Sequence, residues 1–503
     1  MPKSTIKCFA GATLAVLLLA SAACGESQNA ADDPTGTPGA ETTATPSVTE
    51  IEPETEASFD PGVPVNDYGG YTFTFYLRKS GSGFWNVKDI WVEELNGEAL
   101  NDAIYNRNDY INTTYNIDIA QIIMGDNGEC SAYVNKMVTA GENMDAVICN
   151  GNDTTTMAGK GHLMDLKDIP YLNVDQKWWD QNSIHDLSLC GKIFFAAGEL
   201  TEADNNAVNV IAFVKDNVTD YHLEDPYELV REGRFTIDKF VEMSNAVLTD
   251  KNGDGKFNED DVIGYLYFSD SGQTMFNALG NMCAVLDENG DPQITFLPDR
   301  SVESWTKLMS FIQQDCTLSM STELDVYKGM ADYDVKVRMI EGKNTLFSWV
   351  HMRDIENLRE VESDFGILPN PKFDEAQEQY CNENDPYGTG FFSLPITAEN
   401  PERSGIIIEA FSARSMEIVL PAYYDITLQG KYMRDDDSLE MLEIIFDSMI
   451  YDIGRFYNWG SMYGTISSMW NNKQDTFASQ YEKSLKLINK SMEKTLKSYG
   501  VEG

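Results

Sequence analysis

A run of oxygen-bearing side chains between residues 250 and 261 has the spacing of a metal-binding loop. Side-chain oxygens stand at loop positions one, three, five, nine and twelve, and position seven offers a backbone carbonyl. These positions are Asp250, Asn252, Asp254, Asn258 and Asp261, with Lys256 as the carbonyl donor. Glycine at position six allows the tight turn that such a loop requires, so the spacing is that of an EF-hand calcium loop.

Two features of this loop depart from the calcium-binding pattern. Position twelve is Asp261, whose arm is shorter than that of the glutamate that binds the ion through both oxygens. The following segment, Val262–Tyr267, has the pattern of a strand and not of a second helix. We expect one weakly held structural calcium ion that the protein does not require as a cofactor. An acidic turn held by Asx hydrogen bonds, without an ion, is the alternative.

The folded part of the chain alternates strand-like and helix-like segments. The predicted strands are 71–77, 117–123, 144–149, 208–215, 345–349 and 363–371, and the predicted helices are 101–112, 130–140, 235–247, 302–314, 439–448 and 481–499. Thr236 is the expected N-cap of the helix at 235–247. This alternation indicates an α/β fold with parallel sheets flanked by helices. Ligands bind beyond the carboxyl ends of such strands, which places Asn152 and Asp153 near a crevice.

The first 24 residues have the pattern of an export signal. Lys3 and Lys7 precede an apolar core at 9–20, which is too short to span a bilayer because about 20 residues are needed. Small residues then lead to Cys24, and this arrangement resembles a bacterial lipoprotein signal. The resemblance implies removal of residues 1–23 and a diacylglycerol anchor on Cys24, although Ser21 stands where that family has leucine. An ordinary secretory signal with an incidental cysteine is the alternative.

The segment after the signal is predicted to be a disordered leash. Residues 24–67 are rich in alanine, threonine, proline and acidic residues and contain no lysine or arginine. The whole chain has 81 acidic and 37 basic residues, for a net charge of −44. Such a charge disfavours nucleic acid as a partner. We expect a monomer on the extracellular face of the membrane, held there by its lipid anchor only.

Several motifs, taken in their order along the chain, resemble those of a known family. They are Trp178-Trp179-Asp180, Phe235-Thr-Ile-Asp-Lys239, Ile340-Glu-Gly-Lys343 and Phe365-Gly-Ile-Leu-Pro369. The chain resembles the extracellular solute-binding proteins of bacterial ABC importers, in the carbohydrate-type group related to maltose-binding protein. The resemblance covers essentially all of residues 68–503.

This resemblance implies a two-lobed α/β fold in which each lobe is a mainly parallel sheet flanked by helices. Lobe 1 is expected to contain 68–202 and about 388–415, and lobe 2 to contain 203–387 and about 416–503, including the loop at 250–261. The implied function is capture of an oligosaccharide or similar polyhydroxylated solute between closing lobes. The implied partners are that solute and the subunits of a membrane permease.

The resemblance also indicates candidate ligand-binding residues. They are aromatic platforms for sugar faces or short polar groups that hydrogen-bond to hydroxyls. The candidates are Trp349, Trp459, Asp153, Asn152, Glu199, Glu202 and Gln273. Trp178 and Trp179 are assigned to the hydrophobic core.

Two other functions remain open from the sequence. A peptide or other polar solute in the same fold needs charged groups for its termini, and Arg78, Lys79 and Arg353 would provide them. A surface glycoside hydrolase needs a suitably spaced pair of carboxylates, and no spacing singles out such a pair. The chain contains no G-x-S-x-G, H-E-x-x-H or Walker-type motif, so we expect a binding protein and not an enzyme.

Overall fold

The structure is a computed structural model of the 503-residue chain. It describes residues 60–500 except 81–82, 84, 297, 325–331, 359–360 and 430–435. The chain divides into two units, Met1–Ala57 and Ser58–Gly503, and all of the described residues belong to the second unit. The signal, Cys24 and most of the predicted leash lie outside the described residues. Val63, near the end of that leash, packs against the core of the first sheet.

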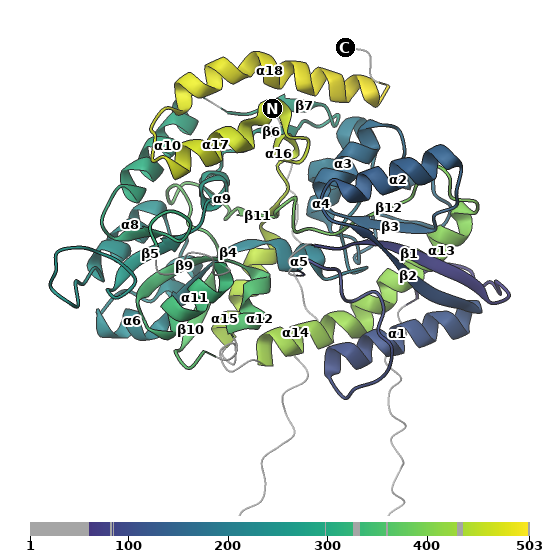
Figure 1. The fold of residues 1–503 in the computed structure, drawn as a ribbon, viewed down its shortest axis with the longest axis horizontal. Coiled ribbons are helices and arrows are strands. Elements are labelled where there is room, and N and C mark those ends of the chain that lie inside the picture. The colour runs from purple at the N-terminus through teal and green to yellow at the C-terminus, as the bar shows by residue number, and fades with distance from the viewer. Residues whose placement is uncertain are drawn as a thin grey trace, which may run out of the picture. The chain divides into compact units, whose positions relative to one another are not determined.

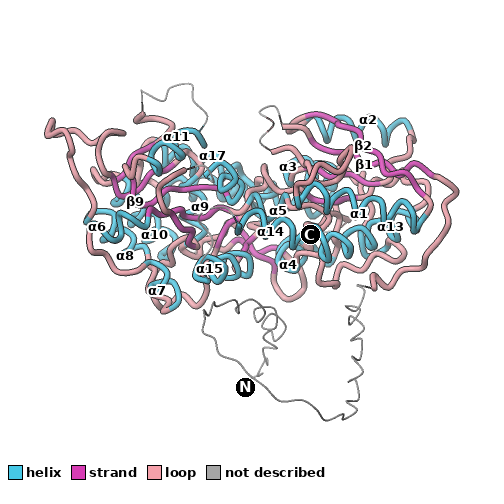
Figure 2. The backbone as a smooth tube through the Cα atoms, turned by 90° about the horizontal axis from the view of Figure 1, so that it is seen from below, coloured by secondary structure: helices cyan, strands magenta, loops and turns pink. Residues whose placement is uncertain are grey.

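The first sheet has four strands in the order β12-β3-β1-β2 (Figure 1). β1 (Tyr71–Arg78) pairs in parallel with β2 (Ile117–Gly125) and with β3 (Ala146–Cys149), and β12 (Phe391–Ser393) joins β3 antiparallel. Helices α1 (Ala99–Tyr115) and α13 (Pro401–Arg414) cover one face, and α2 (Glu129–Ala140) and α3 (Gly151–Gly159) cover the other (Figures 1 and 2). The predicted strands and helices of this region are confirmed.

The second sheet has five strands in the order β10-β4-β9-β5-β8. They are β4 (Asn209–Val214), β5 (Ile263–Tyr267), β8 (Thr317–Ser319), β9 (Thr345–His351) and β10 (Phe365–Leu368). β5 runs parallel to β8 and β9, whereas β4 is antiparallel to β9 and β10. The helix that packs against β5 is α8 (Ile237–Ala246), and the Thr236 hydroxyl accepts a hydrogen bond from the Lys239 backbone N–H at 3.3 Å. The predicted cap is therefore confirmed.

The remaining elements connect and cover these two sheets. The helices are α4 (Gln181–Leu187), α5 (Ala203–Ala207), α6 (Lys215–Asp220), α7 (Pro226–Arg231), α9 (Ser271–Ala278), α10 (Pro298–Ile312), α11 (Asp332–Glu341), α12 (Ile355–Leu358), α14 (Leu420–Gln429), α15 (Asp436–Asp447), α16 (Ile453–Phe456), α17 (Met462–Asn471) and α18 (Phe477–Ser498). A short hairpin joins β6 (Ala284–Leu286) to β7 (Pro292–Ile294). None of the described helices is long and apolar enough to cross a membrane.

The chain passes between the two sheets more than once. It leaves the first sheet after β3, builds the second with β4, β5, β8, β9 and β10, and returns to the first with β12. On this return, β11 (Asn382–Glu383) pairs in parallel with β13 (Met449–Ile450), a strand from much later in the chain. The first sheet is thus discontinuous in sequence, and the predicted two-lobed α/β fold is confirmed. The second sheet is not mainly parallel as expected, because it has two antiparallel and two parallel strand pairings.

Trp178 and Trp179 belong to the core of the first lobe, as expected. Both are buried, and their indole N–H groups donate to the two carboxylate oxygens of Glu409 at 3.0 and 3.2 Å. Burial raises the pKa of Glu409 to about 7, although hydrogen bonds from Asn173 and both indoles oppose the rise. The Trp-Trp pair therefore serves the fold and not the ligand.

Candidate functional site

A cavity of about 790 Å³ lies between residues of the two lobes. Its wall combines aromatic rings, amides and hydroxyls with a few charged groups. The lining residues are Trp85, Asn127, Asn152, Thr155, Thr156, Phe268, Asp270, His351, Asp385, Pro386, Tyr387, Arg455, Phe456, Tyr457, Asn458 and Tyr463. The volume is in the range typical of small-molecule sites.

The cavity lies where several strands end. Trp85, Asn127 and Asn152 follow β1, β2 and β3 of the first sheet, and these strands run parallel. Phe268 follows β5 and His351 ends β9, which is parallel to β5. Because parallel strands bring their carboxyl ends to one edge, loops far apart in the sequence meet at this cavity.

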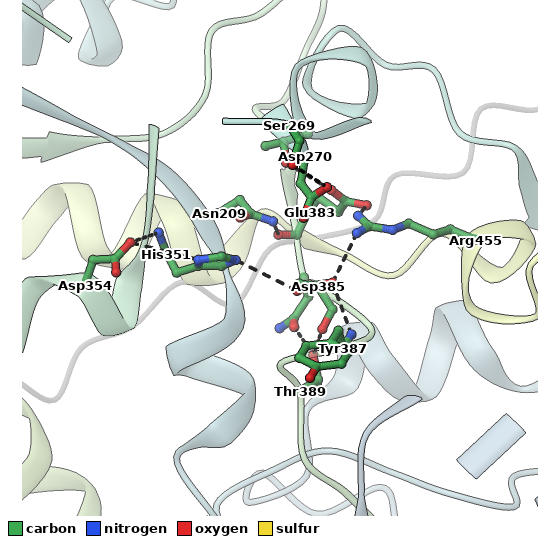
Figure 3. Close-up of polar contacts among 12 residues, drawn as sticks. Asn209, Ser269, Asp270, His351, Asp354, Glu383, Asp385, Tyr387, Thr389 and Arg455 are labelled. Carbon is green, nitrogen blue, oxygen red and sulfur yellow. Dashed lines mark hydrogen bonds and ion pairs between the residues drawn. The ribbon is translucent and has the colours of Figure 1, made fainter. Parts of the chain in front are cut away.

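A cluster of charged side chains lies at the cavity (Figure 3). The Arg455 guanidinium forms an ion pair with Glu383 and a second with Asp385, whose Oδ1 lies 3.1 Å from Nη2. The same guanidinium lies 4.6 Å from the ring centre of Tyr463. The Tyr463 hydroxyl donates to Asp270 at 2.7 Å. Arg455 is a residue of α16, so its two ion pairs connect this helix to β11 and to the segment that follows β11.

Two of these groups have shifted proton affinities. Burial, together with the negative charge of Asp270, raises the pKa of Asp385 to about 7, and the backbone N–H of Tyr387 opposes this rise. Burial lowers the pKa of Arg455, and the nearby oxygens of Tyr463 and Asp270 oppose that change. The charge of Asp385 can therefore change near neutral pH.

His351 extends this polar cluster into the second lobe. Its Nε2 lies 3.8 Å from Asp385 Oδ2, and its backbone N–H donates to Asp354 at 2.9 Å. Asp354 also pairs with Lys336 at 2.6 Å, and both side chains are buried. The Trp85 ring packs edge-on against the His351 ring, with 4.8 Å between ring centres. A residue of the first lobe thus contacts the second lobe directly at the cavity wall.

The two polar candidates of lobe 1 point in different directions. Asn152 lines the cavity, in the first turn of α3. Asp153 is buried beneath it and accepts hydrogen bonds from the backbone N–H groups of Gly128 and Ser131, at 3.0 Å or slightly more. Asp153 therefore fixes the loop that carries Asn127, while Asn152 faces the solute space.

The two predicted aromatic platforms lie one layer behind the cavity wall. Trp349 is 1% exposed within β9, which continues beyond it to His351, and it stacks on Phe268 with ring centres 5.9 Å apart. Trp459 is also 1% exposed, stacks on Tyr457 at 5.7 Å and donates its indole N–H to Thr495 at 2.9 Å. Phe268 and Tyr457, and not the two tryptophans, reach the cavity.

The other three candidates also lie away from the lining. Gln273 is buried in α9 and donates to Asn277 at 2.7 Å, whereas Asp270, at the start of the same helix, reaches the cavity. Glu199 lies near the crossing from lobe 1, and burial raises its pKa to about 8. The backbone N–H of Glu202 donates to Asp89 at 2.7 Å. Glu199 and Glu202 therefore lie near the crossing from lobe 1 and Gln273 lies within α9, and none of the three is in the cavity wall.

The loop at 250–261 is stabilised by its own hydrogen bonds. Asp250 accepts from the backbone N–H groups of Gly253 and Gly255 at 2.6 and 2.9 Å. Asp261 is buried, and its two oxygens accept from the N–H groups of Lys251 and Asn258. Among the described residues, no group of three or more histidine, cysteine or acidic side chains is arranged to hold a metal ion. The second helix of an EF-hand is replaced by β5, as its sequence predicts.

The fold is similar to the folds of several solved proteins that bind sugars. The maltose/maltodextrin-binding domain MalE from Bdellovibrio bacteriovorus, bound to maltotriose, has a TM-score of 0.51 at 12% identity, covering 85% of this chain and 100% of that one. Apo RafE from Streptococcus pneumoniae has a TM-score of 0.53 at 13% identity, covering 84% and 98%. A cyclo/maltodextrin-binding protein complexed with maltotetraose has a TM-score of 0.52 at 12% identity, covering 84% and 97%.

Similarity of sequence adds nothing to this likeness of structure. No protein-family model matches the chain, and no curated protein matches it either. At these identities the neighbours establish the fold, and the role of the cavity has to be argued from its own residues.

Proposed function

We propose that this protein is the substrate-binding lipoprotein of an ABC importer, and that it captures an oligosaccharide or a similar polyhydroxylated solute. The observation that carries the proposal is the composition of the cavity between the lobes. Aromatic faces such as Trp85 and Phe268 suit the apolar faces of sugar rings, and amides and carboxylates such as Asn152 and Asp270 suit hydroxyl groups. The named solutes of the structural neighbours support this class of ligand.

The solute would favour the closed arrangement because it touches both lobes. A ligand shifts the equilibrium between the open and the closed arrangement by the difference between its affinities for them. Contacts to a single lobe would be the same in both arrangements and would give no such difference. Delivery of the closed form to permease subunits, and anchoring through Cys24, belong to the same proposal. Mass spectrometry of the mature N-terminus tests the anchor, since Cys24→Ser should remain unacylated.

Calorimetric titration with a panel of neutral oligosaccharides tests the binding proposal. Trp85→Ala and Phe268→Ala should each weaken binding about ten-fold or more, because an aromatic face contributes roughly 1.5 kcal/mol or more. Trp91→Ala is the matched control, since Trp91 is 39% exposed and is not in the cavity wall. Affinities that both cavity variants leave unchanged would contradict the assignment of the site.

The peptide alternative receives no support from the positions of its candidate groups. Arg78 is buried, pairs with Asp126 at 3.1 Å and lies 4.1 Å from the ring centre of Tyr387. Arg353 is buried too, Lys79 is exposed, and none of the three lines the cavity. For the hydrolase alternative, incubation with polysaccharide separates the two roles, because a binding protein releases no new reducing ends.

We also propose that the loop at 250–261 holds one structural calcium ion. Its support is the ligand spacing from Asp250 to Asp261. Calcium at a concentration well above its dissociation constant should raise the melting temperature, and Asp250→Ala should abolish that rise. Equal melting temperatures with calcium and with chelator would assign the loop to the ion-free turn.

A further inference from the structure

The last helix carries a single stripe of lysines. α18 (Phe477–Ser498) contains Lys483, Lys486, Lys490, Lys494 and Lys497, and all five side chains are exposed. Spacings of three, four, four and three residues keep them within an arc of about 80° around the helix and along a line of about 21 Å. The exposed Leu487 lies beside the stripe.

The opposite face of α18 is fixed to the body of the protein. Ile488 is buried, and Tyr481 packs edge-on against Phe296 with 5.7 Å between ring centres. At the carboxyl end, the Tyr499 carbonyl accepts a hydrogen bond from Lys192 at 3.0 Å. Figure 1 shows α18 lying over α10 and α17, away from both sheets. Because these contacts set the rotation of the helix, the lysine stripe has a fixed outward direction.

The charge of the lysine stripe is opposite in sign to the net charge of the whole protein. Within the described part of the chain, none of the five ammonium groups takes part in an ion pair. The helix has five lysines and two glutamates, so it carries +3, whereas the whole chain carries −44. Charges more than about 8 Å away are largely screened at physiological ionic strength, so a surface touching α18 meets its lysines and not the distant acids.

We propose that the solvent face of α18 binds the surface of an anionic phospholipid bilayer. A straight row of five cations matches a flat array of phosphate groups better than it matches a compact ligand. Each lysine near such a surface contributes about five-fold to binding, and Leu487 adds an apolar contact at the headgroup level. This makes a second membrane contact in addition to the anchor on Cys24, which the sequence alone predicts as the only one.

Vesicle co-sedimentation at physiological ionic strength, where the distant acids are screened, tests this surface. The mature chain carrying Cys24→Ser, so that no acyl chain contributes, is mixed with vesicles of phosphatidylcholine or of equal parts phosphatidylcholine and phosphatidylglycerol. We expect binding to the second mixture only, and its loss at high salt. Changing Lys486, Lys490 and Lys494 together to glutamine should weaken this binding about 100-fold, at about five-fold per lysine.

A charge-matched variant separates the stripe from net charge. Lys88, Lys136 and Lys177 are exposed lysines outside α18, and changing them to glutamine alters the net charge by the same amount. This control should bind anionic vesicles like the parent. The proposal is overturned if the parent fails to bind them, or if the control loses as much binding as the α18 variant. Among the described residues, no hydrogen bond or ion pair joins an α18 lysine to a residue of the cavity wall. Solute affinity should therefore be the same in all three proteins.

Discussion

Removing Arg455, which forms two ion pairs, should destabilise this protein more than removing a surface arginine that forms three. Arg455 pairs with Glu383 and Asp385, and the three side chains are 8%, 1% and 13% exposed. Alanine at this position leaves two carboxylates in a poorly solvated site without their cation. Breaking a buried pair from one side costs about 3–5 kcal/mol, because the remaining charge stays desolvated.

Arg231 is the matched control for this experiment. It pairs with Glu228, Asp437 and Glu440, but these carboxylates are 58%, 44% and 46% exposed. Exposed pairs contribute about 0–1 kcal/mol each, so Arg231→Ala should cost well under the loss at Arg455. Urea unfolding of the parent and both variants measures the free energies of unfolding.

The charge left behind, and not lost packing, should account for most of the cost at Arg455. Adding Glu383→Gln and Asp385→Asn to the Arg455→Ala variant should therefore recover part of the lost stability, since neutral amides need no cation. The loss in the single variant should also shrink as the pH is lowered and the carboxyls take up protons. A loss no larger than that of Arg231→Ala, or one that the amides do not relieve, would refute this reasoning.

The structure also predicts how substitutions at Glu409 and at two glycines change stability. Because burial raises the pKa of Glu409 from 4.5 to about 7, the folded protein keeps a proton there that the unfolded chain has lost. The contribution of this group to stability therefore falls as the pH rises from about 4.5 to about 7, and Glu409→Gln should flatten the dependence of melting temperature on pH over that range. Gly264→Ala places a methyl group 2.3 Å from the Ser244 carbonyl oxygen, so it should lower the free energy of unfolding by roughly 1–3 kcal/mol. Gly464 lies in helix α17, and a methyl group there meets nothing within 4 Å. Gly464→Ala should therefore raise the free energy of unfolding, measured in urea, by about 1 kcal/mol. Equal effects of the two glycine changes would contradict the close approach at β5.

The sequence predicted the elements because their signals are local. At alternate positions of β1, Phe73, Phe75 and Leu77 are buried, whereas Thr72 and Thr74 between them are exposed or half-buried. Thr236 has a side chain that caps a helix wherever the next residues can form one. Such signals depend on residues within one or two turns of each other. They establish which segments form strands and helices, and the parallel order of the first sheet follows from the helices between its strands.

Apart from Asn152, which lines the cavity as predicted, the sequence located the segments around the cavity and not its lining residues. The segments around Trp349 and Trp459 do border it, but each tryptophan is buried, and its smaller aromatic neighbours Phe268 and Tyr457 form the wall. The largest apolar side chain gains most from burial, so a tryptophan at a strand or helix end is drawn into the core.

The charged residues of the cavity had no local signal at all. Asp385 is one of 81 acidic residues in this chain, and only folding brings it to Arg455, which is 70 residues away in sequence. Trp85 likewise meets His351 through the packing of the two lobes. Contacts of this kind depend on where the chain crosses between lobes, which periodicity does not encode.

The charge state of Asp385 should link solute binding to the release of protons. Burial and the charge of Asp270 raise the pKa of Asp385 to about 7, so near neutral pH its carboxyl is part protonated in the free protein. A solute hydroxyl that donates to this carboxylate favours its charged form and lowers its pKa, so binding should release a fraction of a proton near pH 7. Titration calorimetry in buffers of different ionisation enthalpy measures this release, and Asp385→Asn should abolish it. If the heat of binding to the parent protein is the same in every buffer, the solute does not form this hydrogen bond to Asp385.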